Sequence, residues 1–264
     1  MKRLFRIYDD IPRGVYLGVA IFSICFILAL WSLLSYTGLT DTRLLPTPSD
    51  VLAAAQREAG DGTLWGDMLA SSYRIGLGFL ASTVLAIPIG LLMGTLKIGE
   101  AFFEPPIDLI RYMPAVAFVP LTIVWIGTDD RQKVAILFIG TFFQQVLLIM
   151  DNVKNVPRNL VNVAYTFGLK PWEVLTRVIL PASLPGIVDT LRITMGWAWT
   201  YLVVCELVAA DQGLGSRIMI SERYFDMPAM ILGVLVIGLL GITIDYLFKF
   251  LYARLFPYMK RRAA

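Results

Sequence analysis

Long apolar runs separated by short charged segments set the pattern of the chain. A helix of about 18 apolar residues is long enough to cross the hydrocarbon core of a membrane. Six runs meet this length approximately: 14–36, 69–95, 102–126, 134–150, 186–210 and 227–251. Each is expected to be helical, because lipid offers no hydrogen-bond partners to the backbone. The pattern predicts an all-α polytopic membrane protein, with residues 1–264 forming a single transmembrane domain.

Two of the runs have a second interpretation. The run at 14–36 follows Lys2, Arg3, Arg6 and Arg13, as a signal peptide would. It is longer than a typical signal core, and no Ala-x-Ala-like site follows it, so a retained anchor is favoured. The run at 102–126 carries Asp108 and Arg111. A re-entrant third run, leaving five spans, is the alternative to six.

The basic residues indicate the orientation. Six spans place both termini on one side, and that side holds 14 of the Lys and Arg residues against six on the other. Cytoplasmic loops are rich in Lys and Arg. Both termini are therefore expected in the cytoplasm, and the net charge of +3 reflects topology rather than nucleic-acid binding.

Composition narrows the chemistry. Hydrophobic residues make up 57% of the chain, and its mean hydropathy is +0.70. Histidine is absent, which removes the commonest general base and the commonest metal ligand. Cys25 and Cys205 lie in apolar runs and read as buried small side chains. No metal site and no catalytic residue is expected.

Two segments outside the runs are long. On the outer side, 37–68 contains Pro48-Ser49-Asp50, which predicts a helix start capped by Ser49 or Asp50. On the cytoplasmic side, 151–185 predicts a helix from 158 to 167. Gly168 would follow it in the left-handed conformation, and a second helix, 172–179, would end at Leu180-Pro181.

The expected helix at 158–167 is apolar around most of its circumference, which makes it unstable alone in water. It must bury that surface against its own membrane domain or against a partner. Shape alone is also compatible with an ordinary packed loop.

The spacing within 151–185 resembles a motif of ABC importer permeases: Glu-Ala-Ala, three residues, Gly, nine residues, Ile, one residue, Leu-Pro. Asn162 and Val163 stand in place of the leading Glu and Ala, and a valine in place of Ile. The matching residues, which the resemblance assigns to coupling with an ATPase, are Ala164, Gly168, Val178, Leu180 and Pro181.

Further stretches resemble the nitrate, sulfonate, taurine and bicarbonate permeases. The segment 111–121 is similar to their Arg-Pro-x-Pro-x-x-Ala-x-x-Pro-Leu segment, with Tyr112 in place of the first Pro. The segment 45–51 is similar to their Leu-Pro-x-Pro-x-x-Val entry, and 71–79 to the start of their second span. Glu206-Leu207 with Gly213-Leu214-Gly215 is similar to the end of their fifth span.

The resemblance implies a type I ABC importer permease fold, with six transmembrane helices and a cytoplasmic coupling helix-turn-helix. The expected partners are a second copy in a homodimer, two ATPase subunits, a substrate-binding protein and membrane lipid, with no nucleic acid. The chain would be a transport subunit and not an enzyme, because no Lys precedes Ser or Thr as a Walker A loop requires. ATP and Mg would be used by the ATPase, and the location would be the bacterial inner membrane.

Three residues are candidates for the translocation path. Arg111 would attract an anion, or alternatively pair with Asp108 or Glu104. Glu206 would repel an anion unless it is paired, with Arg74 as the candidate partner. Trp197 is a candidate ligand, although tryptophan more often packs or lies at an interface.

The outer loops 37–68 and 211–226 would receive the binding protein, with Asp129, Asp130, Arg131 and Lys133 as additional contacts or as a solvated turn.

Two other functions remain as rivals. A secondary transporter would show inverted repeats and ionisable residues near the midplane, and no clear repeat joins the two halves. An intramembrane enzyme would need paired Asp, His ligands or an activated Ser in a span. The sequence leaves the solute open among nitrate, bicarbonate, taurine and sulfonates. It also leaves open whether the two permease subunits are identical.

Overall fold

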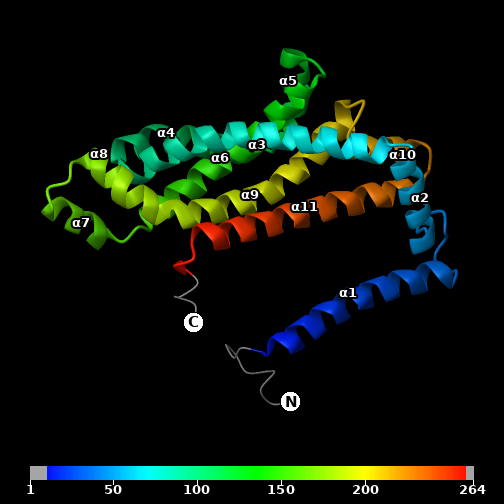
Figure 1. Cartoon of the computed structure of the whole chain (residues 1–264). Helices are drawn as coiled ribbons and strands as arrows, with labels where there is room; N and C mark the ends of the chain where they lie inside the picture. Colours follow the sequence, from blue (N-terminus) through cyan, green and yellow to red (C-terminus); the bar gives the residue numbers. More distant parts are fainter. Residues whose placement is uncertain (1–10, 260–264) are drawn as a thin grey trace.

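The computed structural model describes residues 11–259, and within them the chain is helical with no strand (Figure 1). The helices follow one another in the order α1 (Arg13–Tyr36), α2 (Pro48–Gly60), α3 (Thr63–Thr95), α4 (Lys97–Arg111), η1 (Ala115–Phe118), α5 (Val119–Ile126), α6 (Asp130–Lys154), α7 (Arg158–Thr166), α8 (Pro171–Val174), η2 (Leu175–Ile179), α9 (Leu180–Ala209), α10 (Leu214–Arg223) and α11 (Met227–Leu255).

A bundle of four long helices, α3, α6, α9 and α11, forms the body of the protein. The helices α3 and α6 approach most closely, because α3 turns glycines toward α6. A Cβ added at Gly78 would lie 2.6 Å from the Leu137 Cβ, and one at Gly90 would lie 2.7 Å from the Ile149 Cγ2. Small residues let membrane helices pack backbone against backbone.

Short polar contacts also join these helices in the interior. Thr141 on α6 and Ser82 on α3 are fully buried, with their hydroxyl oxygens 2.9 Å apart. The Gln145 side-chain amide donates to the Thr194 hydroxyl of α9 over 3.2 Å. Inside a membrane such bonds satisfy groups that lipid cannot, and they fix how neighbouring helices are rotated.

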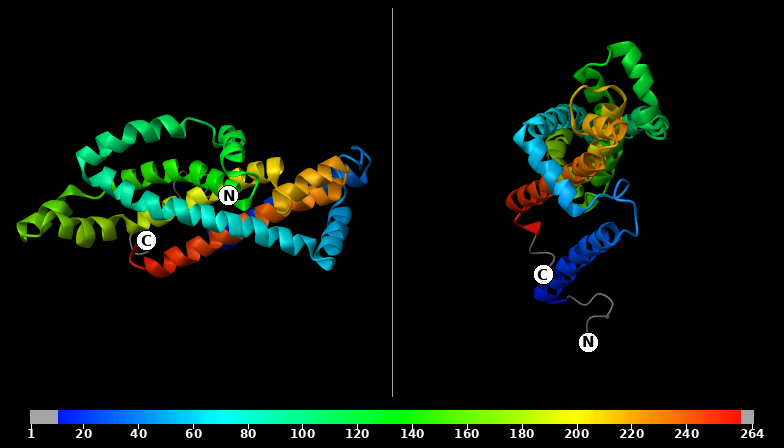
Figure 2. Two further views of the ribbon diagram at one scale, coloured as in Figure 1. Left: turned by 90° about the horizontal axis from the view of Figure 1, so that it is seen from above. Right: turned by 90° about the vertical axis from the view of Figure 1, so that its right-hand side faces the viewer.

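The first helix, α1, is set apart from the bundle (Figures 1 and 2). None of the most apolar stretch within its candidate span is buried. Its attachment lies near its end, where Trp31 donates its indole N–H to the Pro46 carbonyl over 3.0 Å and packs against Val51 and Ala54 of α2. An apolar helix exposed on every side requires lipid or another chain around it.

The third apolar run is broken. The helix α4 and the pair η1–α5 meet at an angle of 86° across 112–114. Pro114 precedes η1, and the residue before a proline is disfavoured in helical conformation. The described residues therefore hold five helices that are long and apolar enough to span a membrane, or six if the bent pair is one span.

The starts of α2 and α3 differ from expectation. The cap of α2 is Thr47, and not Ser49 or Asp50 as the sequence suggested: its hydroxyl accepts from the Asp50 N–H, and the Asp50 carboxylate accepts from the Thr47 N–H over 3.1 Å. Pro48 takes the first helical position, where its missing N–H is harmless. The helix α3 begins at Thr63, two turns before the apolar run at 69–95, because helix propensity does not stop at the polar boundary.

Candidate functional site

The segment between α6 and α9 projects from one end of the bundle (Figure 1). Its first helix, α7, ends as the sequence predicts. Gly168 has φ +80°, its N–H donates to the Tyr165 carbonyl, and the Leu169 N–H donates to the Ala164 carbonyl over 3.2 Å. This pair of hydrogen bonds closes the end of the helix. It requires a residue in the left-handed conformation, which glycine adopts with the least strain.

The helix α7 leaves apolar side chains exposed although it lies beyond the spans. Phe167 is 79% exposed, and Leu160, Val163 and Tyr165 are each about half exposed, whereas Ala164 is buried. In a short helix at the end of the bundle, such a surface is typical of a contact with another protein or with a membrane.

Val178, Leu180 and Pro181 occupy a continuous helical stretch, so the expected helix end at Leu180-Pro181 is wrong. The chain runs through α8 and η2 into α9, and η2 is one π turn in which the Leu180 N–H donates to the Leu175 carbonyl. Pro181 has no N–H to donate and crowds the preceding turn of a regular α-helix. A widened π turn relieves this conflict without ending the helix.

A cluster of polar and charged side chains lies toward the opposite end of the bundle, where α3, α6, α9 and α10 converge; three of the four are buried, and Asp130 is about half exposed. We call it the outer charge cluster, and its members are Ser71, Arg74, Asp130 and Glu206. Arg74 bridges two carboxylates: its Nη1 lies 2.6 Å from Glu206 Oε1, and its Nε lies 2.7 Å from Asp130 Oδ1. Glu206 is only 1% exposed, and a buried carboxylate is strongly destabilising unless a partner such as Arg74 compensates its charge.

The Glu206 carboxylate also organises the turn between α9 and α10. It accepts from the Ser71 hydroxyl at 2.9 Å and from the Gly215 N–H at 2.9 Å. Gly213 has φ +124°, and a Cβ there would collide with the Glu206 carboxylate; a Cβ at Gly215 would lie 2.7 Å from the Glu206 Cβ. Two glycines two residues apart are therefore required by the carboxylate they surround.

A second set of contacts joins α10 to the helices at the outer surface. Asp67 accepts from the Gly213 N–H at 2.8 Å and from Arg217 Nε at 3.0 Å. Glu58 of α2 lies 3.9 Å from the same guanidinium, and burial raises the pKa of its carboxyl. The helix α10 is thus attached to α2, α3 and α9 at once.

The family model of the binding-protein-dependent transport system inner membrane component matches residues 86–261. This match covers more than half of the chain. The chain belongs to this family of ABC importer permeases.

Related permeases match along most of their length. A probable ABC transporter permease protein of Brucella abortus is 37% identical over 93% of this chain and 97% of its own. The taurine transport system permease protein of Escherichia coli is 30% identical over 94% and 92%. The inward-facing MetNI methionine ABC transporter has the same fold, with a TM-score of 0.61 at 20% identity over 73% of this chain and 94% of that one.

The family consists of transport subunits and not enzymes, and the permease fold is that of type I importers. Among residues 11–259, no group of His, Cys, Asp and Glu is arranged to hold a metal ion.

The three candidate path residues are in different environments. Arg111 ends α4, where its Nε lies 2.8 Å from Asp108 Oδ1 and its guanidinium stacks 4.7 Å from the Tyr112 ring centre. Trp197 of α9 is 38% exposed, while Glu206 is enclosed. No hydrogen bond or ion pair within the described part of the permease joins any two of the three.

One charge group was not found from the sequence. Asp245 pairs with Lys249 at 2.6 Å, as the spacing of four indicates, but Asp245 also meets Arg192 of α9 at 3.2 Å. Asp189 lies 3.5 Å from Arg192. The sequence indicates only the pair of Asp189 and Arg192, through their spacing of three residues within α9. The contact between α9 and α11 depends on how the two helices pack.

Proposed function

We propose that two copies of this permease face each other and form the translocation path for a small anionic solute. A substrate-binding protein delivers the solute to the outer end, and two ATPase subunits, which use ATP and Mg, drive the change of access. The chain lies in the bacterial inner membrane with both termini in the cytoplasm. The bias of Lys and Arg toward the termini supports this orientation.

The observation that carries the proposal is the exposed apolar surface of α7. Val163 and Phe167 protrude from a helix whose end is fixed by Gly168, and the helix stands at the tip of the bundle. An amphipathic helix presented in this way fits a groove on a partner. Ala164, Gly168, Val178, Leu180 and Pro181 are the coupling residues: the first two shape α7, and the last three join it to α9.

The opposite end supports a docking face for the binding protein. Helices α2 and α10 lie there, at the far end from α7 (Figure 1). Arg57 and Asp226 form an ion pair of 2.8 Å across this surface. Attachment of α10 to three other helices keeps the face in a fixed shape before the binding protein arrives.

The relatives support a solute that carries an anionic group, since one of them is named for taurine, which has a sulfonate group. Arg111 is the candidate cation, because Asp108 neutralises it only from one side and its side chain is partly exposed. Trp197 is the candidate path residue on α9. Glu206 acts from within the protein, through the α9–α10 turn.

The coupling assignment is tested by Phe167→Asp in the permease co-expressed with its ATPase. We expect loss of the co-purified ATPase and of solute-stimulated ATP hydrolysis, since a carboxylate cannot be buried in an apolar groove without a partner. Tyr258→Asp is the control: Tyr258 is an exposed aromatic residue that follows the end of α11, outside the coupling segment. Retention of both properties in Phe167→Asp would contradict the assignment.

The rival function predicts a different result. A secondary transporter would carry solute in liposomes under an ion gradient with no ATPase present. We expect no uptake by the permease alone, and uptake that requires ATP when the ATPase and binding protein are added.

A further inference from the structure

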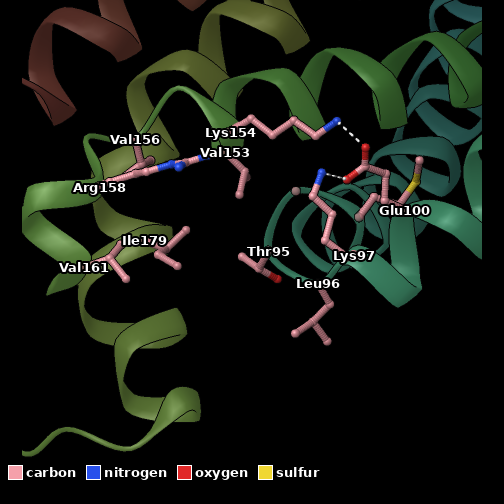
Figure 3. Close-up of a pocket in the computed structure, with 12 residues that line it drawn as sticks. Thr95, Leu96, Lys97, Glu100, Val153, Lys154, Val156, Arg158, Val161 and Ile179 are labelled. Atoms are coloured by element: carbon pink, nitrogen blue, oxygen red, sulfur yellow. Dashed lines mark hydrogen bonds and ion pairs between the residues drawn. The ribbon is translucent and has the colours of Figure 1, made fainter. Parts of the chain in front are cut away.

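A cavity lies beside the base of the coupling segment. Its volume is about 350 Å³, and its walls come from the end of α3, the start of α4, the end of α6, α7 and η2 (Figure 3). Neither the fold nor the proposed coupling role of α7 accounts for it.

Basic side chains line part of the cavity. Glu100 holds two lysines, with its Oε2 2.8 Å from the Lys97 Nζ and its Oε1 3.2 Å from the Lys154 Nζ (Figure 3). Arg158 lines the same cavity, and no ion pair between described residues involves it. Three cations and one carboxylate leave the cavity with two excess positive charges, which favours an anionic occupant.

The cavity lies at the level where the membrane spans end. Lys97 begins α4 directly after α3 ends, and Lys154 is the last residue of α6. The apolar stretches of α3 and α6 end within about one turn of Lys97 and Lys154, which places these lysines at the level of the lipid headgroups. Anionic headgroups gather at that level.

The rest of the lining is apolar. Met93, Leu96, Val153 and Ile179 form a wall next to the basic opening. Free phosphate uses only charge and hydrogen bonds, whereas a phospholipid presents a phosphate and an acyl chain together. The combination of a basic opening with an apolar wall fits the second.

We propose that this cavity binds the phosphate headgroup of an anionic membrane lipid. Arg158 and Lys154 contact the phosphate, Glu100 holds the two lysines in place, and the apolar wall receives the upper part of an acyl chain. The lipid then occupies the corner between α4 and the first turn of α7, so that the position of the coupling helix depends on the lipid composition.

The test uses the permease–ATPase complex, purified and incubated with phosphatidylglycerol or phosphatidylcholine, with bound lipid counted by native mass spectrometry. We expect retained phosphatidylglycerol and no retained phosphatidylcholine. Arg158→Gln and Lys154→Gln should each weaken retention about fivefold, the effect of one basic residue near a charged surface. Arg158→Lys keeps the charge and should retain the lipid.

Arg254→Gln is the matched control, because it removes an exposed cation near the same end of the bundle on α11, outside the cavity. Equal losses in Arg254→Gln and Arg158→Gln would show general surface attraction and overturn the proposal. Displacement of the lipid by millimolar inorganic phosphate alone would identify a free-anion site and also overturn it. Loss of the ATPase from Arg158→Gln with phosphatidylglycerol still retained would assign the cavity to the protein interface instead.

Discussion

The outer charge cluster makes a quantitative prediction about stability. Replacing Arg74 with Met removes the counterion of Glu206 and leaves its carboxylate inside the protein with only the Ser71 hydroxyl and the Gly215 N–H as partners. Breaking a buried ion pair from one side costs about 3–5 kcal/mol. Replacing Glu206 with Gln keeps the side chain's shape and loses one charged hydrogen bond, at about 1.5–3 kcal/mol. Arg74 then still pairs with Asp130.

The double variant is expected to be more stable than the sum of the single effects indicates. Once Glu206 is neutral, removing Arg74 strands no charge, so the two changes should fall short of additivity by about 1–3 kcal/mol. The measurement is the free energy of unfolding in mixed micelles, by titration with a denaturing detergent and with near-UV circular dichroism as the signal.

Arg43→Met is the matched control, since Arg43 is an exposed arginine with no ion pair among the described residues. Its effect should stay within about 0.5 kcal/mol. If Arg74→Met is no less stable than Arg43→Met, or if the two changes in the cluster simply add, the interpretation of the cluster as one coupled unit is wrong.

Three further predictions concern single positions. Gly90→Ala should destabilise the permease by about 1–3 kcal/mol, because its Cβ would press on Ile149, whereas Gly76→Ala, where nothing lies within 4 Å, should be neutral or mildly stabilising; thermal unfolding of the pair decides. Gly168→Ala should lower ATPase co-purification through backbone strain of about 1 kcal/mol, since open space surrounds the position, and Gly168→Asn, better tolerated in the left-handed region, should lower it less. Burial raises the pKa of Glu58 above its usual 4.5, so the neutral carboxyl stabilises the protein at low pH, and this contribution is lost as pH rises through the pKa of the folded state. Glu58→Gln should therefore make stability less dependent on pH and raise the unfolding midpoint at pH 7. A lower midpoint with an unchanged pH profile would contradict this reasoning.

Much of the fold follows from the lengths of the apolar runs, because apolar length determines which segments can enter lipid. The same rule explains why the boundaries shift. The helix α3 begins at Thr63, after Gly62 in the left-handed conformation and before the long apolar run, so hydropathy alone does not set this boundary. The bend at Pro114 and the continuation through Pro181 depend on how the neighbouring turns adjust to a missing N–H.

The site was predictable where local spacing determines it and not where packing does. Gly168 was found because a left-handed helix end leaves a recognisable residue at one position. Glu206 was recognised as a charge in a span, with Arg74 as a candidate partner, but its enclosure by Gly213 and Gly215 arises from the meeting of three helices. The contact between Arg192 and Asp245 likewise depends on the rotation of α9 against α11, which one sequence does not specify.

The helical stretch from Pro171 to Val208 has 38 residues and joins the two ends of the permease. At 1.5 Å per residue it is a rod of about 57 Å. A tilt of about 5° about one end carries the other end through about 5 Å, which is the height of one helical turn. If α8 is pushed, as the proposed coupling requires, the movement passes through the π turn from Leu175 to Ile179 before it reaches the carboxylate of Glu206.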